Sequence, residues 1–348
     1  YDKRAYYDIK DEFFSNWPHP MASNFPVPII PTHVDVGTTS VLSSMFRNPM
    51  KTVNVKGIGK EDKPYAPLIG HTMNWINGVE SEIFDIQALN VFRTFLHGTG
   101  FVKSWIDIGD EFKIRDASIP IELVIKPIRG NGCQRDKCDR ITQLIPMTPN
   151  DWMFRRGLKI RGKPIYEHLD MIVPGFEPSN SLMGEELKML ESQVSGLDVE
   201  AMENRDMRYM AESHLTYYPP EKFKAIELIV WWSLRHGIIH RVVENKEPDL
   251  LRPHSDYWFY GSDGLAYQRS LPEILRHIQE KAFYRDKQVT DAYDTVMNPR
   301  AFIDDDSDFD PNAHVLTPNV MYKVSKGTKI QYLERNIGPI ISAERELD

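Results

Sequence analysis

The spacing of apolar residues from Leu271 to Pro299 predicts one long helix. Its apolar residues recur close to helical spacing, at Leu271, Ile274, Leu275, Ile278, Ala282, Val289, Ala292 and Val296. Ser270 can cap the first turn, and after that turn no Gly or Pro interrupts the pattern until Pro299 ends it. About 26 residues at ~1.5 Å each give a rod of roughly 39 Å. Because Arg285 interrupts an already thin stripe, we expect the helix to pack partly against other copies of the chain.

The N-terminal half predicts helices followed by a β-rich section. Residues 1–33 contain five prolines and read as an initial helix and then an extended arm. Val34–Met45 is compatible with a helix, and Ala66–Gly98 has helical spacing with a break near Gly78. A hairpin is predicted next, with strands at Phe101–Ile108 and Glu111–Ile114.

The remaining pattern predicts more strands and a second helical segment. Strands are expected at Lys51–Val55, Ile119–Ile128, Ile141–Met147, Ala301–Ile303, Val320–Val324 and Lys329–Leu333. Met183–Leu215 looks helical and highly charged, with a weak point at Gly196. Phe223–Val243 is aromatic and β-branched, so it predicts a small sheet, broken at Gly237.

Composition places the chain among globular proteins of two or three domains, with 348 residues, 41% of them hydrophobic and 26% charged. No apolar run approaches the 18 or so residues of a membrane span, and the polar start does not resemble a signal peptide. Tyr1 is not a Met, and the end, GPIISAERELD, reads as the opening of a helix, so we expect more protein to follow. Two cysteines fit a reducing cytosol.

The net charge of −8 argues against a protein that grips nucleic acid over a broad face. Such a grip needs surplus Lys and Arg, because affinity comes largely from counterion release at phosphates. The chain is therefore either not a nucleic-acid protein or one that meets DNA without holding it. One local exception is the basic patch FRRGLKIRGK, which follows Asp151.

An acidic cluster invites a metal interpretation: Asp304, Asp305, Asp306, Asp308 and Asp310. A calcium loop aligned on it would need Gly and Glu where this chain has Phe309 and Val315, which favours a solvated acidic loop. The alternative is a metal-dependent nuclease or phosphoesterase that uses Asp304–Asp310 with a histidine.

The other candidate sites favour structural roles. Cys133 and Cys138 could be half a zinc site, but no second pair exists, so two free thiols in a hairpin loop are expected. His236 and His240 have the spacing of a helical metal pair, whereas Gly237 and its β-branched neighbours favour a strand. No P-loop, G-x-S-x-G or G-x-G-x-x-G is present, so we predict no catalytic, metal or cofactor-binding residues.

Aromatic residues cluster in the second half, at Trp231, Trp232, Tyr257, Trp258, Phe259 and Tyr260. They could stack on bases, but core or subunit packing is the commoner role and is favoured here.

Together these segments resemble the portal protein of tailed bacteriophages. SNFPVPIIPTHVDVGTTSVLSSMFRNP, at Ser23–Pro49, is similar to the portal N-terminal arm and helix. The helix before His97–Trp105 (HGTGFVKSW) resembles the portal order of amphipathic helix, small-residue turn and strand ending in Trp. TPNDWMFRR, at Thr148–Arg156, resembles the segment that introduces the stem. A charged helix, a small aromatic sheet and the long helix from Leu271 then follow in the family's order.

The resemblance implies an α+β fold with a mixed α/β wing, a long α-helical stem and a small β-containing clip. The implied boundaries are 1–180 for the N-terminal part of the wing, 181–218 for the first stem helix, 219–264 for the clip, 265–299 for the second stem helix, and 300–348 for the return to the wing and the start of a further helix. The C-terminal crown and tunnel loop of the family are absent from this chain.

The resemblance also implies a structural, non-enzymatic role without cofactors. A portal is a ring, usually of twelve subunits, at the capsid vertex of the virion, through which double-stranded DNA is packaged and ejected. Its expected partners are the terminase large subunit, head-completion or tail adaptor proteins, and the major capsid and scaffolding proteins. It assembles in the host cytoplasm and needs no membrane. Another ring-forming virion component, such as a tail adaptor, is an alternative, which the chain length and two-stem layout disfavour.

Two groups of site residues follow from this expectation. Candidate channel or inter-subunit residues of the stem are Arg276, Lys281, Tyr284, Arg285, Lys287 and Gln288. Candidate partner-docking residues of the clip are Trp231, Trp232, Arg235, His236, His240 and Arg241. We expect a packed stripe at Ile274, Ile278, Ala282 and Val289. We also expect ion pairs for Arg276–Glu280 and Lys287–Asp291 at i, i+4 spacing, and an acidic partner for Arg285.

Overall fold

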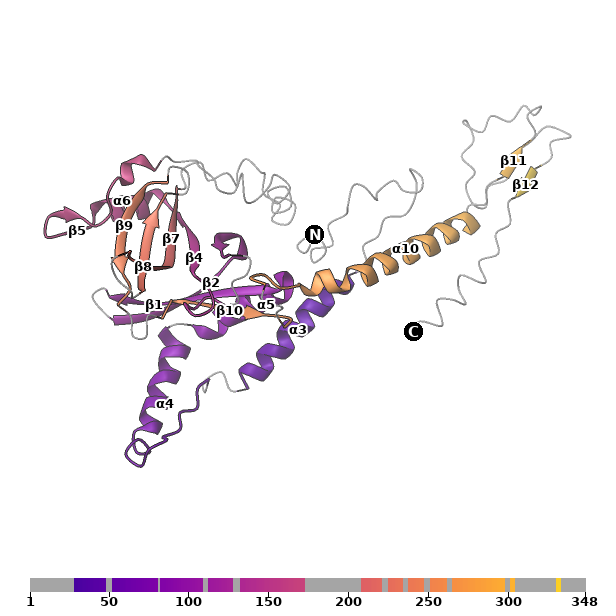
Figure 1. The fold of residues 1–348 in the computed structure, drawn as a ribbon. Coiled ribbons are helices and arrows are strands. Elements are labelled where there is room, and N and C mark those ends of the chain that lie inside the picture. Colours follow the sequence, from indigo (N-terminus) through magenta and orange to yellow (C-terminus); the bar gives the residue numbers. More distant parts are fainter. Residues whose placement is uncertain are drawn as a thin grey trace. The chain divides into compact units, whose positions relative to one another are not determined.

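A computed structural model describes the chain in twelve stretches (Figure 1). The described residues are 28–47, 52–80, 82–108, 112–127, 132–172, 208–220, 225–233, 237–246, 251–261, 265–297, 301–303 and 330–332. They fall into two compact units, one from Ile30 to Ile274 and the other from Leu275 onward. The fold contains both helices and sheets, in agreement with the predicted α+β class.

Among the described residues, three α-helices precede the sheets. Helix α3 spans Ile29–Met45, so it begins within the predicted extended arm and includes the predicted helical segment. Helix α4 spans Ala66–Trp75 and runs into a π-helical turn at Ile76–Glu80. Helix α5 spans Ile83–His97, which confirms the predicted break in the helical pattern.

A three-stranded antiparallel sheet follows, in the order β10-β1-β2. Strand β1 spans Thr99–Ile108, β2 spans Phe112–Ile119 and β10 spans His254–Trp258. The β1–β2 pairing confirms the predicted hairpin. Strand β10 comes from the other end of the unit and pairs along the opposite edge of β1.

The larger sheet has five antiparallel strands in the order β3-β4-β7-β8-β9. Their bounds are Val124–Ile125, Arg140–Met147, Arg208–Tyr217, Ile226–Trp232 and Ile239–Glu244. A single 3-10 turn, Ile121–Leu123, leads into β3. The central strand β7 therefore lies between β4 and β8, two strands that the sequence analysis had assigned to separate regions of the chain.

Strand β7 corrects the prediction of a helix over Met183–Leu215. Arg208–Tyr217 is extended, and its middle residues, Met210 to His214, are buried on both faces of the sheet. Glu212 is one of these buried residues. A strand with one exposed face is recognised in a sequence by alternating apolar and polar residues, and a strand that is buried on both faces and contains a carboxylate does not show this alternation. Residues 173–207, where the rest of the first stem helix was expected, lie outside the described residues.

The predicted clip is likewise not a separate sheet. Strands β8 and β9, from residues 219–264, share a sheet with β4 from residues 1–180. The aromatic character of β8 was read correctly as a strand, but its partners lie on both sides of the proposed boundary.

The predicted strand at Lys51–Val55 also differs from the structure. Its described part is extended but pairs with no strand among the described residues. Instead, the Asn74 amide of α4 accepts from the Val53 amide at 2.8 Å and donates to the Val53 carbonyl at 3.0 Å. A helix side chain thus takes the place of a neighbouring strand.

Helix α6, at Pro149–Gly157, begins with a capping box in which Thr148 and Asp151 exchange hydrogen bonds. A hairpin of two short strands follows, β5 at Lys159–Ile160 and β6 at Lys163–Pro164. Its two-residue turn has positive φ at both positions, 51° at Arg161 and 77° at Gly162, as hairpin turns of this length require. A 3-10 turn, Leu169–Met171, ends this region.

Two apolar clusters form the core of the first unit. One joins α6 to the large sheet: Met147, Trp152, Tyr166, Leu169, Ile172 and Met210. The other joins the two sheets: Phe101, Ile119, Val124, Cys133 and Ile141. The apolar contacts that hold the two sheets together therefore come from residues 101–141.

Helix α10 spans Leu271–Met297, 27 residues, which confirms the long helix predicted from the apolar spacing. The Ser270 hydroxyl accepts a hydrogen bond from the Glu273 amide at 3.1 Å and so caps the first turn, as expected. Beyond it, β11 at Ala301–Ile303 pairs with β12 at Ile330–Tyr332, which confirms both predicted strands. The predicted strand Val320–Val324 lies outside the described residues. None of the described helices has the length and apolarity to cross a membrane.

Candidate functional site

The predicted channel residues of α10 differ in exposure along the helix. Arg276 pairs with Glu280 at 2.8 Å, which confirms the expected i, i+4 pair, and both side chains are exposed. Lys281 and Gln288 are exposed, and Tyr284 is half-buried with its ring 6.0 Å from that of Phe283.

The apolar stripe of α10 is only partly covered. Val289 is buried and Ala282 is half-buried, but Ile274 is 41% exposed and Ile278 is 56% exposed. The N-terminal part of the stripe is therefore uncovered in a single chain, and its packing against another subunit stays a prediction.

Lys287, a predicted channel or inter-subunit residue, is not exposed in the single chain. It is buried, and its Nζ lies 5.9 Å from the centre of the Phe283 ring. The aliphatic stem of a lysine can be covered while its ammonium rests on an aromatic face, so charge alone did not define the exposed side.

The acidic partner predicted for Arg285 is not found among the described residues. Its Nη2 is buried and has no hydrogen-bond partner there. The helix neighbours three and four positions away include no acid, being Lys281, Ala282, Gln288 and Val289. Any carboxylate for Arg285 must therefore come from another segment or another subunit, so its acidic partner stays a prediction.

Two of the predicted clip residues belong to a cluster of arginines stacked on aromatic rings. The Arg241 guanidinium of β9 lies 4.9 Å from the Trp231 ring centre and 5.4 Å from that of Tyr166. Arg155 of α6 lies 5.8 Å from the same Tyr166 ring. Such stacking holds a guanidinium plane in place while its N–H edge stays free to donate.

Trp152 extends this cluster on the α6 side. Arg208 of β7 lies 4.3 Å from the Trp152 ring centre, and Arg156 lies 5.2 Å from it. We call the seven side chains the arginine–aromatic cluster: Trp152, Arg155, Arg156, Tyr166, Arg208, Trp231 and Arg241. The sequence singled out Trp231 and Arg241 and noted the basic patch after Asp151, but it gave no sign that the two regions meet.

Charge is only partly compensated in this cluster. Arg156 pairs with Asp170 at 2.9 Å, but both side chains are more than half exposed. Arg155 donates to the Tyr166 hydroxyl and Arg208 to the Ile172 carbonyl, each at 3.3 Å. Among the described residues, three of the four guanidinium groups therefore have no ion-pair partner.

An open pocket of about 420 Å³ adjoins the cluster. It is lined by Arg156, Pro164, Tyr166, Glu167, His168, Leu169 and Asp170. It therefore mixes acidic and basic groups, and it lies beside the β5–β6 hairpin rather than in the core.

The other predicted clip residues have structural roles or lie outside the described residues. His240 is buried, and its Nδ1 lies 2.8 Å from the Glu167 carbonyl. Burial lowers the pKa of His240, so its ring is neutral near pH 7. Trp232 donates to the Ser213 hydroxyl at 2.7 Å. Arg235 and His236 are not among the described residues.

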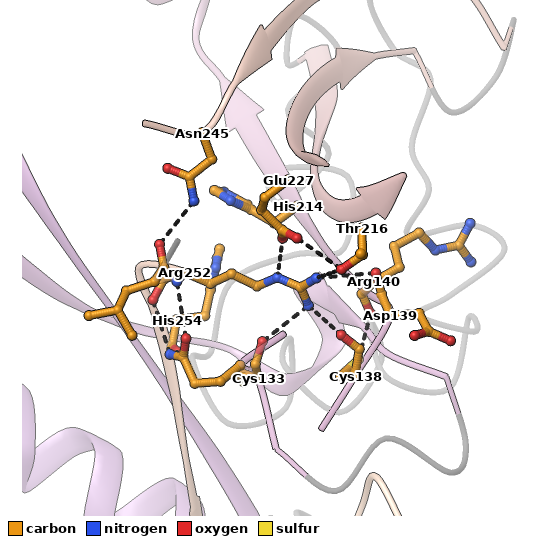
Figure 2. A network of polar contacts seen from close by, with 12 residues as sticks. Cys133, Cys138, Asp139, Arg140, His214, Thr216, Glu227, Asn245, Arg252 and His254 are labelled. Atoms are coloured by element: carbon orange, nitrogen blue, oxygen red, sulfur yellow. Dashed lines mark hydrogen bonds and ion pairs between the residues drawn. The ribbon is translucent and has the colours of Figure 1, made fainter. Parts of the chain in front are cut away.

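Arg252 is the centre of a buried polar network between the two sheets, shown in Figure 2. Its Nε donates to Glu227 at 2.5 Å, and both side chains are fully buried. Its remaining nitrogens donate to the carbonyls of Cys133, Cys138 and Asp139 and to the Thr216 hydroxyl. One arginine thus ties the loop that precedes β4 to strands β7 and β8.

This network shows the structural role of the two cysteines. Cys133 and Cys138 are buried and free, as predicted, and it is their carbonyl oxygens that accept from Arg252. Burial, followed by the charge of Asp256, raises the pKa of the Cys133 thiol far above its ordinary value, so the thiol stays protonated. The loop is held in place by hydrogen bonds to its backbone carbonyls rather than by the chemistry of its thiols.

A second buried network surrounds Glu212 of β7. Its carboxylate accepts from Lys103 at 2.6 Å and from Trp231 Nε1 at 3.0 Å, and it contacts His214 Nε2 at 3.0 Å. Burial alone would raise the pKa of Glu212, but the His214 hydrogen bond and the Lys103 charge bring it well below its usual range. The side chain is therefore an anion held between two strands.

His254 stands beside this network, with its ring 5.2 Å from that of His214. Burial lowers the pKa of His254 well below its usual value, and the nearby Lys103 charge acts in the same direction. His214 and His254 each have a buried Nδ1 without a hydrogen-bond partner among the described residues. His254 is therefore neutral in the folded protein.

No group of three metal-ligating side chains occurs within the described stretches. The predicted acidic cluster Asp304–Asp310 lies outside them, so it remains a sequence observation. No family model matches this chain, and no curated protein matches it.

Proposed function

We propose that this chain is the protomer of a portal-like ring, a structural conduit for double-stranded DNA at the capsid vertex of a tailed bacteriophage. Terminase would dock on the ring during packaging, and tail adaptors would dock on it afterwards. The ring itself would perform no chemistry, and ATP hydrolysis would belong to the terminase.

The observation that carries this proposal is the incomplete burial of α10. A 27-residue helix carries Ile274 and Ile278 exposed on its apolar stripe. Arg285 has no acidic residue within helical reach. A neighbouring copy of the helix would cover the isoleucines and could supply a carboxylate. Because a closed ring uses one repeated heterologous contact, no two-fold symmetric surface is needed on the protomer.

The order of elements also supports the proposal. An amphipathic helix, α5, leads through Gly98 into β1, in the order that the resemblance to portal proteins implies, although β1 continues past Trp105 to Ile108. The long helix follows an aromatic sheet that contains Trp231 and Trp232. Because Arg208–Tyr217 is a strand, the proposed first stem helix must end before residue 208 and is shorter than the range predicted from the sequence.

Trp231 and Arg241 were predicted to dock protein partners at the clip, and the Arg241 guanidinium lies 4.9 Å from the Trp231 ring centre. Docking of a protein at these two residues stays a prediction.

Native mass spectrometry and negative-stain electron microscopy of the full-length protein test the proposal. We expect closed rings of about twelve subunits with a central hole. A stable monomer at micromolar concentration would rule out the ring, and chelator-sensitive DNA cleavage would favour the nuclease alternative instead.

A further inference from the structure

We propose that the β5–β6 hairpin and the adjoining arginine–aromatic cluster form a binding surface for the phosphate backbone of a nucleic acid. This surface is made of residues of the first unit, whereas the candidate channel residues of α10 belong to the second unit. The inference does not depend on ring formation.

The hairpin presents cations at its tip and on both faces. Lys159, Arg161 and Lys163 are all exposed, and the segment 152–164 contains no acidic residue. The pairing of Ile160 with Lys163 places these two side chains on one face, while Lys159 projects from the other. Figure 1 shows β5 extending away from the body of the large sheet.

The hairpin is held rigidly at its base. Ile165 donates to the Leu158 carbonyl at 3.0 Å, and both side chains pack against the apolar cluster around Trp152. At the tip, positive φ at Arg161 and Gly162 gives the tight turn that brings the two strands together. Its cations are therefore displayed by a fixed element, which reduces the entropy lost on binding.

The cluster supplies oriented guanidinium groups next to the hairpin base. Arg155 and Arg241 both stack on Tyr166, and Arg208 stacks on Trp152. None of these three has a carboxylate at ion-pair distance among the described residues. Stacked guanidinium groups with free N–H edges suit phosphate oxygens better than the point charge of lysine does.

The local charge contrasts with that of the whole chain. Seven basic side chains gather here: Arg155, Arg156, Lys159, Arg161, Lys163, Arg208 and Arg241. The acids of the surrounding segment are Asp151, Glu167 and Asp170, and the buried Glu212 accepts from Trp231 of the cluster, in a protein whose net charge is −8. A basic surface on an acidic protein directs a polyanion to one place and leaves the rest of the molecule repulsive to it.

A nucleic acid fits this surface better than an anionic membrane does. Membrane anchoring needs apolar side chains on the same side as the cations. On α6, Phe154 is 68% exposed, and at about 100° per residue it lies about 160° around the helix from Arg156 and about 100° from Arg155. Met153, 64% exposed, lies about 60° from Arg156. The hairpin adds Ile160 as its only exposed large apolar side chain.

The experiment measures binding of the full chain to a labelled 20-base-pair DNA duplex and to a single strand, between 50 and 200 mM salt. The test variant is Lys159→Gln, Arg161→Gln and Lys163→Gln together. The matched control is Lys56→Gln, Lys60→Gln and Lys63→Gln, which makes the same change in net charge at exposed positions of another loop.

We expect the hairpin variant to bind at least tenfold more weakly at 50 mM salt, with the control close to wild type. The slope of log K against log salt should become shallower by about 2 to 3 for the duplex, since each lost phosphate contact removes about 0.9. A second variant, Arg155→Gln with Arg241→Gln, leaves the hairpin unchanged and should also bind more weakly than the wild type.

Equal binding by the hairpin variant and the wild type would overturn the inference, as would an equal loss in the control. Binding of anionic phospholipid vesicles in place of DNA would overturn it in favour of a membrane, and equal competition by polyglutamate would favour an acidic protein. Ring formation is scored separately by electron microscopy. If the protein binds DNA through the hairpin but forms no rings, only the proposed function is rejected. If it forms rings but shows no hairpin-dependent DNA binding, only this inference is rejected.

Discussion

Arg252 shows how one side chain holds together segments that are distant in the sequence. Its ion pair with Glu227 is buried, and its other nitrogens satisfy carbonyls of the loop that contains Cys133 and Cys138. Removing one member of such a pair leaves an uncompensated charge in the core, which is far more costly than replacing both members.

We therefore predict that Arg252→Met lowers the free energy of unfolding by about 3 to 5 kcal/mol. Adding Glu227→Gln should restore at least about 1 kcal/mol of this, because the buried anion is removed. Urea denaturation of the two single variants and the double variant measures the coupling. Strict additivity of the two substitutions would contradict the role assigned to the pair.

His254 predicts a pH dependence of stability. Its folded-state pKa is lowered, so below the unfolded value of about 6.5 the unfolded chain binds a proton that the folded chain does not. Stability is therefore complete above that pH and falls as the pH decreases, by at most about 1.4 kcal/mol per pH unit for this group. His240, whose pKa is also lowered, acts in the same direction.

Chemical denaturation between pH 7.5 and 5 measures this dependence. His254→Gln should reduce the slope of stability against pH, while the same substitution at the exposed His71 should not change it. An unchanged slope in His254→Gln would mean that His254 is not held neutral by its surroundings.

At the scale of elements, the connection from α5 to β1 depends on Gly98. Its φ is 77°, and a Cβ there would stand 2.1 Å from the Gln268 carbonyl oxygen, on the segment that leads into α10. The helix therefore ends in a left-handed residue against which another segment packs without a gap.

Gly98→Ala should lower the free energy of unfolding by more than about 1 kcal/mol, because both the backbone and the contact are strained. Gly157, at the end of α6, has open space around it and no positive φ, so Gly157→Ala serves as the control and should change stability little. Thermal unfolding compares the two, and a similar melting temperature for both variants would contradict the packing described at Gly98.

Most of the correct predictions concern elements defined by local patterns, although the predicted strand Ile119–Ile128 is a 3-10 turn at Ile121–Leu123 followed by the two-residue strand β3. The apolar spacing and the Ser270 cap were sufficient for α10, and the polar turn between two β-branched runs was sufficient for the β1–β2 hairpin. Strand β7 was taken for a helix because Glu212 and His214 look like surface residues until Lys103 and the neighbouring strands surround them.

At the scale of the whole molecule, the exposed stripe of α10 is the surface that a ring would cover. Ile278→Asp should abolish ring assembly, with the fraction of assembled protein falling at least tenfold, because a charge would be buried in the subunit contact. Since Ile278 is 56% exposed in a single chain, the protomer should keep its fold by circular dichroism.

The same substitution at Ile58, which is 98% exposed in the first unit, is the control and should leave assembly intact. Analytical ultracentrifugation measures both variants. Rings formed by Ile278→Asp as readily as by wild type would exclude this stripe as the subunit contact, whatever the subunit count.

The sequence by itself determined the elements whose signals are local: α10 with its cap, the helix–turn–strand passage at Gly98, and the free thiols of Cys133 and Cys138. These features depend on residues a few positions apart, so their pattern is visible along the chain. Only the tertiary structure decided that β7 is a strand, that Lys287 is buried, and that Arg155 and Arg241 meet at Tyr166. The reason is physical: the energy of a buried charge or a stacked guanidinium depends on partners 25 to 109 residues away in the sequence, and apolar spacing carries no record of them.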